Sequence, residues 1–265
     1  MLKPKILQLE VTNDCNLNCT ICMRLKSKRA VGYLTLESFR RIPITEFKEI
    51  AFHGWGEPLL HPELFKFIEI ASTEGVKTSL ITNGVLLDKK LDEIAKSGLD
   101  SIAFGIFTTK NKEVVFRNVK KFSRVRNEIN VESYIDITIL PWNLSEISKI
   151  VKFAGECELD GVVLHKLFHL HDSSLRPLSD DEIKLACKIA KDIGKEVGVK
   201  VYCPPKKSRP CAVALSCIFL GWDLTASPCC FLHEMGYHYN SLNFNEHRKF
   251  LAEMRENDIC KRCPW

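Results

Sequence analysis

Apolar residues recur along the first two-thirds of the chain as short runs that alternate with longer stretches of helical spacing. The short runs predict strands at Ile6–Val11, Glu49–His53, Lys77–Ile81, Ser101–Ile106, Glu132–Leu140 and Gly161–His165. The longer stretches predict helices at Leu36–Arg41, Pro62–Glu74, Asp88–Ser97, Lys112–Val125 and Leu144–Glu156. Such alternation gives right-handed βαβ units and a parallel sheet. Six units are fewer than the eight of a complete barrel, so we expect an α/β fold with a partial (β/α)6 barrel.

The strand Glu132–Leu140 has a polar and an apolar side. Its polar set is Glu132, Tyr134, Asp136 and Thr138, and it alternates with Ser133, Ile135, Ile137 and Ile139. Because side chains of a strand point alternately to opposite faces, the two sets lie on different sides. We expect the apolar side to meet the helices and the polar side to line a ligand cavity inside the barrel.

The pattern changes near residue 200. A helix over Asp180–Glu196 precedes this point, and Ser179 is a good N-cap for it. Short strands at Lys200–Cys203 and Ile218–Leu220 and a last helix at Asn245–Asn257 then predict a small α+β region. We therefore expect two domains, residues 1–199 and residues 200–265.

Composition excludes several classes of protein. The net charge of +5 is modest and its lysines are spread along the predicted helices, which does not favour a nucleic-acid partner. No apolar run is long enough to cross a membrane, and the first residues lack the apolar core of a signal peptide. The expected location is cytoplasmic, with no membrane partner.

Cysteine is abundant and clustered: 12 residues, of which three lie between positions 15 and 22 and seven between 203 and 263. Without an export signal, such clustering favours metal ligation over disulfides. Cys157 and Cys187 stand apart from both groups, and we interpret them as small buried apolar residues.

The first cluster, Cys15, Cys19 and Cys22, has the spacing C-x3-C-x2-C and follows the first strand. A closed metal site usually takes four protein ligands, so three leave one position for a small molecule. The segment Gly54–Pro58 follows the second strand, and Thr82 and Asn83 follow the third. Parallel strands end on the same side of a sheet, so all three loops are expected at one rim.

The cysteine spacing together with Gly54-Trp55-Gly56-Glu57-Pro58 resembles the radical S-adenosylmethionine (SAM) family. The resemblance implies that Cys15, Cys19 and Cys22 bind three irons of a [4Fe–4S] cluster and that SAM chelates the fourth. It also implies that Gly54, Trp55, Gly56 and Glu57 line the amino group of SAM, with Thr82 and Asn83 as further cofactor contacts. The cluster would reduce SAM, and the resulting 5′-deoxyadenosyl radical would abstract a hydrogen atom from the substrate. A zinc loop is the alternative for the three thiols, but no fourth ligand lies close in sequence.

Two positions depart from the family pattern. Ile21 stands where an aromatic residue often precedes the third cysteine, and the fourth strand lacks the usual Ser-x-Asp-like ending. Thr108 and Thr109 are the substitutes we expect near the SAM ribose.

The late cysteines resemble the shortened SPASM or Twitch extension of the same family, with Leu224 in place of the usual turn glycine. The resemblance implies an auxiliary [4Fe–4S] cluster bound by Cys211, Cys229, Cys260 and Cys263. Cys217 and Cys230 are alternatives for a ligand position, and a structural zinc ribbon is the alternative for the whole group.

Polar residues at strand ends are the candidates for substrate chemistry. Asp136, His165 and Lys166 are the expected catalytic residues, because an oxidation needs a base; Glu132 and Tyr134 are further candidates. His169 and His171 form either a metal site or a surface loop.

The sequence thus predicts a radical SAM enzyme with two clusters, supplied with electrons by a donor such as ferredoxin or flavodoxin. The expected substrate is a small metabolite or a precursor of a pterin-type metal cofactor. A ribosomal peptide is the alternative, less favoured because we see no room for a peptide-recognition domain. A non-catalytic Fe–S, zinc or electron-carrier protein is the alternative from another class.

Overall fold

The computed structural model describes residues 4–106, 112–207, 211–240, 244–254 and 256–264. They fall into two compact units. The first unit contains residues 1–80, 93–99 and 207–263, and the second contains 81–92, 100–206 and 264–265. The predicted division at residue 200 rests on a different criterion, the change in sequence pattern, and stays a prediction.

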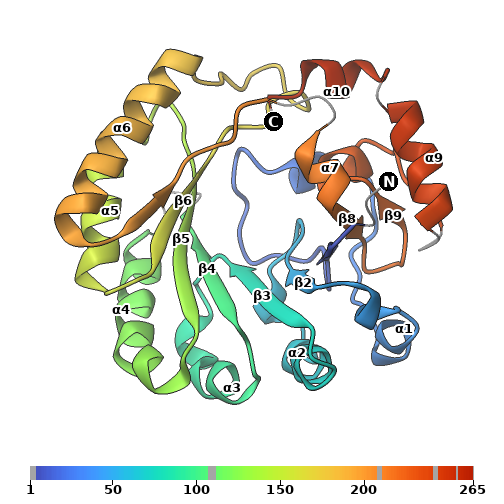
Figure 1. Ribbon diagram of the computed structural model, residues 1–265, viewed down its shortest axis with the longest axis horizontal. Helices are drawn as coiled ribbons and strands as arrows, with labels where there is room; N and C mark the ends of the chain where they lie inside the picture. The colour runs from blue at the N-terminus through green and yellow to red at the C-terminus, as the bar shows by residue number, and fades with distance from the viewer. Residues whose placement is uncertain (1–3, 107–111, 208–210, 241–243, 255, 265) are drawn as a thin grey trace. The chain divides into compact units, whose positions relative to one another are not determined.

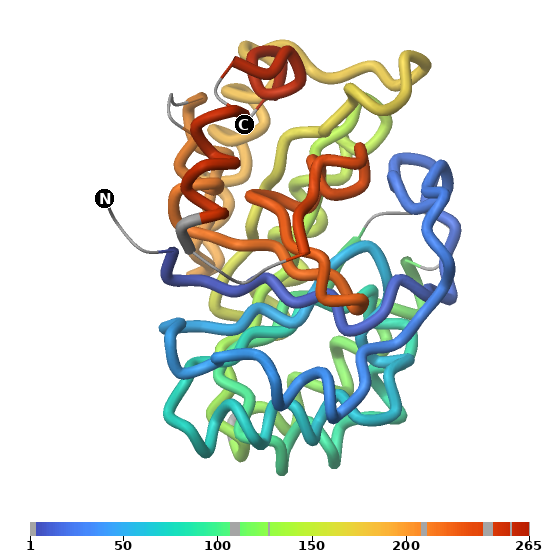
Figure 2. Tube along the Cα trace, turned by 90° about the vertical axis from the view of Figure 1, so that its right-hand side faces the viewer, coloured from blue at the N-terminus to red at the C-terminus, as the bar shows by residue number. Residues whose placement is uncertain are grey.

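Strand β1 (Ile6–Leu9) is the central strand of the first unit. It lies between β2 (Glu49–Phe52) and β8 (Cys217–Leu220) and runs parallel to both. Beyond β2 lies β3 (Lys77–Thr82), again parallel, and beyond β8 lies the antiparallel β9 (Ala226–Ser227). Figure 2 shows β1, in dark blue, beside β8, in orange, although the two strands are far apart in the sequence. All four residues of β8 are buried, as expected for a strand inside a sheet.

The helical elements of the first unit come from both ends of the chain. In chain order the short 3-10 turns are η1 (Met23–Lys26), η2 (Ile44–Glu46) and η3 (Pro58–Leu60). The α-helices are α1 (Leu36–Arg40), α2 (Leu64–Thr73), α7 (Ala212–Ser216), α8 (Cys230–Glu234), α9 (Phe244–Met254) and α10 (Asp258–Arg262). Phe39 of α1 stacks on Phe67 of α2, with ring centroids 4.6 Å apart.

The second unit has four parallel strands in sequential order. They are β4 (Ser101–Gly105), β5 (Glu132–Thr138), β6 (Gly161–His165) and β7 (Lys200–Tyr202). Its helical elements are η4 (Leu87–Lys89), α4 (Lys112–Ile129), η5 (Leu144–Glu146), α5 (Ile147–Glu156) and α6 (Asp180–Val197). Figure 1 shows α4, α5 and α6 along one side of these strands. Helix α3 (Leu91–Lys96) contributes residues to both units.

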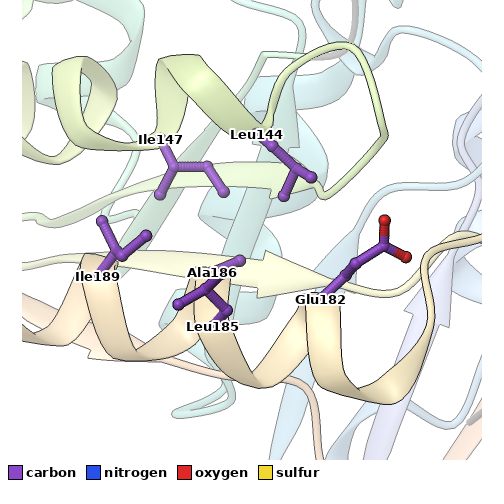
Figure 3. Close-up of a pocket in the computed structure, with 6 residues that line it drawn as sticks. All are labelled: Leu144, Ile147, Glu182, Leu185, Ala186 and Ile189. Atoms are coloured by element: carbon purple, nitrogen blue, oxygen red, sulfur yellow. The ribbon is translucent and has the colours of Figure 1, made fainter.

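Helix α6 has strong signals at both ends. Ser179 accepts a hydrogen bond from the Glu182 amide while the Glu182 side chain accepts from the Ser179 amide, so the predicted cap is confirmed. Gly198 ends the helix with a φ of 74°, a left-handed conformation that favours glycine. A pocket lies between α6 and the start of α5 (Figure 3). Its lining is Leu144, Ile147, Glu182, Leu185, Ala186 and Ile189.

The predicted class, a mostly parallel α/β sheet with helices, is confirmed. Each of the six predicted strands is present within two residues of its predicted bounds. Near residues 200 and 218, β7 pairs with β6 and β8 pairs with β1, both in parallel.

Candidate functional site

The three N-terminal cysteines lie together on the loop that follows β1. Cys15, Cys19 and Cys22 are each half-buried. The Cys22 amide donates to the Cys19 carbonyl at 2.9 Å, which closes a turn between the last two. Burial, with a smaller contribution from the thiols of Cys19 and Cys15, raises the pKa of Cys22 to about 11. The fold thus gathers three thiols within electrostatic reach of one another.

The glycine-rich segment after β2 packs directly on this loop. A Cβ atom on Gly56 would lie 2.2 Å from the Thr12 carbonyl oxygen and 2.6 Å from that of Asp14. The Glu57 amide donates to the same Asp14 oxygen at 2.7 Å. Only glycine fits at position 56, because any side chain would collide with backbone. The predicted meeting of the first two loops is therefore observed within the first unit.

Glu57 presents a buried carboxylate beside the glycines. The residue is 2% exposed, and its Oε1 accepts a hydrogen bond from the Leu59 amide at 3.0 Å. A buried carboxylate and a closely approaching backbone are the acceptors that an ammonium group requires. The residues present therefore fit the amino group of SAM.

Trp55 connects the glycine segment to the C-terminal cysteines. Its indole Nε1 donates to the Cys230 carbonyl at 3.2 Å, and its ring meets the Phe231 ring edge-on at 5.6 Å. Its backbone amide donates to Glu10 Oε2 at 3.0 Å. One residue thus contacts both β1's end and the start of α8.

A buried ion-pair network, which the sequence did not reveal, underlies this contact. The Arg29 guanidinium pairs with the carboxylates of Glu10 and Glu234, both almost fully buried. Burial raises the pKa of Glu10, and the charge of Arg29 opposes that rise. The sequence did carry one sign of this network: Glu10 lies inside the apolar run Ile6–Val11, and a charged residue in a buried strand usually has a partner of opposite charge.

The four predicted auxiliary ligands come from separated elements of the first unit. Cys211 precedes α7, Cys229 precedes α8, Cys260 lies in α10 and Cys263 follows it. Burial raises the pKa of Cys229 well above its usual value, and the thiols of Cys230, Cys263 and Cys211 contribute. Burial and the thiol of Cys211 likewise raise the pKa of Cys260. Each of the four therefore lies within electrostatic range of at least one of the others.

The two alternative ligands form a different pair. Burial, and to a smaller extent the thiol of Cys217, raises the pKa of Cys230 to about 12. A hydrogen bond from Gln8 on β1 opposes this rise. Cys217 is 7% exposed, and burial also raises its pKa to about 12. In the part of the chain that the structure describes, no three His, Cys, Asp or Glu side chains close around a single metal ion.

The remaining cofactor candidates belong to the second unit. Thr82 and Asn83 are buried, and they accept hydrogen bonds from the amides of Gly84 and Val85 at 3.1 and 3.0 Å. Their contact with SAM stays a prediction. Thr108 and Thr109 lie outside the described residues.

Asp136 and His165 form a hydrogen-bonded pair at the ends of β5 and β6. The distance from Asp136 Oδ2 to His165 Nε2 is 2.8 Å. Burial lowers the pKa of His165, but the charge and hydrogen bond of Asp136 outweigh this effect, so the pKa is raised. Lys166 turns instead to Asp180, with 3.1 Å between Nζ and Oδ1. A histidine held by a carboxylate can take up and release a proton.

The polar side of β5 follows the predicted alternation. Ile135 and Ile137 are at most 1% exposed, and Tyr134 donates to Glu132 at 3.0 Å on the other face. Among the residues with assigned positions, His169 and His171 join no third potential metal ligand.

Comparison with known proteins settles the family. The model of the radical SAM superfamily matches residues 9–154, more than half of the chain. The chain belongs to the radical SAM superfamily, whose members bind SAM and a [4Fe–4S] cluster. Membership supports an enzyme, and the expected resemblance is confirmed.

Curated relatives share moderate identity. One is the "Tungsten-containing aldehyde ferredoxin oxidoreductase cofactor-modifying protein" of Pyrococcus furiosus, 24% identical over 199 residues, which are 68% of this chain and 54% of that protein. Another is the "Probable GTP 3′,8-cyclase" of Methanocaldococcus jannaschii, 30% identical over 166 residues, 57% of this chain and 55% of that protein. The chain spans about half the length of these two relatives.

Solved structures share the fold at low identity. Streptococcus suis SuiB bound to precursor peptide SuiA gives a TM-score of 0.71 at 15% identity, covering 96% of this chain and 65% of SuiB. Native anSMEcpe with bound AdoMet and Cp18Cys peptide gives 0.68 at 17% identity, covering 99% and 87%. The described part of the chain holds no helix that is long and apolar enough to span a membrane.

Proposed function

We propose that this chain reductively cleaves SAM at a cluster held by Cys15, Cys19 and Cys22. The contact between the cysteine loop and the glycine segment carries the proposal. Gly56 has no room for a Cβ against Thr12, and the Glu57 amide is bonded to Asp14, next to the first cysteine. When bound, the cluster and SAM supply the radical that abstracts a substrate hydrogen atom. The residues themselves bind and orient: three thiolates hold iron, and Glu57 with the glycine backbone receives the SAM amino group.

The test is anaerobic reconstitution of the full chain with iron, sulfide, SAM and a strong reductant. We expect 5′-deoxyadenosine by mass spectrometry, dependent on reductant. An intact cluster that produced none would contradict the proposal and favour an electron carrier.

The auxiliary cluster is the second element of the proposal, with Cys211, Cys229, Cys260 and Cys263 as ligands. Mutual effects on the pKa values of these thiols support it. With four cysteine ligands this cluster has no position for substrate, so it would pass electrons to or from the active site. Metal analysis separates the outcomes: about eight irons per chain for two [4Fe–4S] clusters, and about four irons with one zinc for a zinc ribbon.

The Asp136–His165 pair is the proposed site of proton transfer. Asp136 orients the imidazole and raises the pKa of His165. His165 can therefore take a proton from a substrate and release it. Lys166, whose ammonium pairs with Asp180, is the third proposed catalytic residue. Solvent-isotope incorporation into product, lost in His165→Gln, would test this role.

The proposed substrate is a small metabolite or a precursor of a pterin-type metal cofactor. The curated relatives favour it, since one is named a cyclase of GTP and another a cofactor-modifying protein. GTP is the first compound to test, with product formation as the readout. A peptide remains the second candidate because the fold is similar to that of SuiB, which was solved with a precursor peptide. Ferredoxin or flavodoxin is the proposed electron donor.

A further inference from the structure

Three thiols of the second unit belong to neither proposed cluster, and two of them, Cys187 and Cys203, share one helix–strand contact. Cys187 lies on α6 and Cys203 follows β7, and both are half-buried. The sequence predicted Cys187 to be a small buried apolar residue. In the structure it is half-buried, and the thiol of Cys203 influences its pKa. Cys157, which received the same interpretation, is indeed buried, at 2% exposed.

The packing of α6 on β7 places these thiols opposite each other. A Cβ atom on Gly194 would lie 2.6 Å from the Val199 carbonyl oxygen and 2.8 Å from Val201 Cγ2, so the helix backbone touches the strand there. Cys187 lies on the same helix face two turns earlier, about 10 Å along the axis. Cys203 shares a strand face with Val201 and lies about 7 Å further along. Helix α6 and the strand β7 that follows it run antiparallel. The step back from Gly194 to Cys187 along the helix and the step on from Val201 to Cys203 along the strand therefore point in the same direction.

The electrostatics of Cys187 agree with this placement. Burial and a hydrogen bond with Cys203 raise the pKa of Cys187 to about 12. Lys191 and Lys166 lie close enough to Cys187 to oppose this rise. Cys187 is therefore placed to donate its S–H to the Cys203 sulfur.

We propose that Cys187 and Cys203 form a reversible redox-active pair that a low-molecular-weight disulfide oxidises to an intramolecular disulfide. The Cys203 thiolate attacks the reagent, forms a mixed disulfide and releases one thiolate. Cys187 then loses its proton, attacks the Cys203 sulfur and releases the second thiolate. Two electrons pass from the pair to the reagent, and the two protons of the pair end on the released thiols. The proposal holds whether or not the chain cleaves SAM.

The disulfide would tie the first half of α6 to the end of β7. It would close a loop of about 15 residues, a length at which a crosslink restricts the unfolded chain substantially. The second unit should therefore resist thermal unfolding more in the oxidised form than in the reduced form.

The experiment exposes the reconstituted full chain, without oxygen, to a series of ratios of oxidised to reduced glutathione. Samples are quenched in acid, alkylated and digested, and the peptides are measured by mass spectrometry. We expect a crosslinked peptide pair containing Cys187 and Cys203, two hydrogen masses lighter than the reduced pair, while iron content stays constant. Cys187→Ser and Cys203→Ser should each abolish it, and Cys157→Ser should leave it unchanged.

Three outcomes would overturn the proposal. One is full alkylation of both thiols at the most oxidising ratio. Another is mixed glutathione disulfides without a crosslink. The third is crosslinks distributed among many cysteines, which would indicate unspecific oxidation. The crosslink is measured first in the chain without substitutions. The test of the proposal therefore does not depend on whether a serine variant folds.

Discussion

The two groups of proposed cluster ligands differ in how the chain assembles them. Cys15, Cys19 and Cys22 share one loop and are half-buried, and the glycine segment contacts the backbone of Thr12 and Asp14 just before the first of them. Cys211, Cys229, Cys260 and Cys263 come from the borders and interior of three short helices, and folding alone brings them together. Local spacing therefore specifies the first group, whereas the second depends on the packing of the C-terminal helices.

Removal of one local ligand should have the largest effect. Cys19→Ala is expected to lose 5′-deoxyadenosine formation completely and about four irons per chain. Cys157→Ala is the matched control, because Cys157 is buried in the second unit and outside both groups. If Cys19→Ala formed 5′-deoxyadenosine at the normal rate, the N-terminal cysteines would not hold the SAM-cleaving cluster, and they would no longer differ in role from the C-terminal ones.

Adjacent cysteines provide a sharper test of the second group. Cys229→Ser should lose the auxiliary iron, again about four atoms per chain, while Cys230→Ser should retain it. The reason is that Cys229 interacts with Cys263 and Cys211, two other proposed ligands, as well as with Cys230, whereas Cys217 is the thiol that raises the pKa of Cys230. Iron analysis and electron paramagnetic resonance of the reduced protein measure the result. The reverse pattern would assign Cys230 as the ligand.

A glycine substitution tests how tightly the first group is fixed. Gly56→Ala should destabilise the chain by about 1–3 kcal/mol and weaken SAM binding about tenfold, because the added methyl collides with the Thr12 carbonyl. Gly75→Ala is the control: its φ of 73° also disfavours alanine, but nothing lies within 4 Å of its Cβ position. It should lose stability without losing SAM affinity. Equal SAM affinity in both variants would disprove the close-contact role of Gly56.

The smallest expected effect lies in the second unit. Because the pKa of His165 is raised by Asp136, their ion pair stabilises the fold fully below about pH 6.5 and is lost as the pH rises through the folded-state pKa. Asp136→Asn should remove this dependence, worth up to about 1 kcal/mol, from urea-unfolding curves. Asp180→Asn should not, since Asp180 pairs with Lys166 and not with a histidine. An unchanged pH dependence in Asp136→Asn would show that the pair contributes nothing.

The sequence predicted what short-range patterns encode. The six strands and the Ser179 cap follow from local patterns. The resemblance to the family's C-terminal extension placed Leu224 at a turn glycine position, and Leu224 has a positive φ of 63°. The Asp136–His165 contact was within reach because Asp136 lies on the polar face of its strand and His165 ends the neighbouring parallel strand.

Long-range pairing could not be predicted in the same way. Nothing near residue 218 indicates that its strand pairs with Ile6–Leu9, and the Pro204-Pro205 break concealed that β7 continues the sheet of β6. The Glu10–Arg29–Glu234 network and the Cys187–Cys203 contact likewise join residues whose spacing carries no periodic signal.

The position of β1 between β2 and β8 also has a consequence for biosynthesis. On the ribosome, one edge of β1 can pair as soon as residues 49–52 have emerged, but the other edge must wait for residues 217–220. Such a contact between distant parts of the chain forms slowly and leaves an unpaired strand edge exposed meanwhile. The loop with Cys15, Cys19 and Cys22 follows that strand directly, so iron delivered before synthesis reaches β8 would meet a loop whose supporting strand is only half covered.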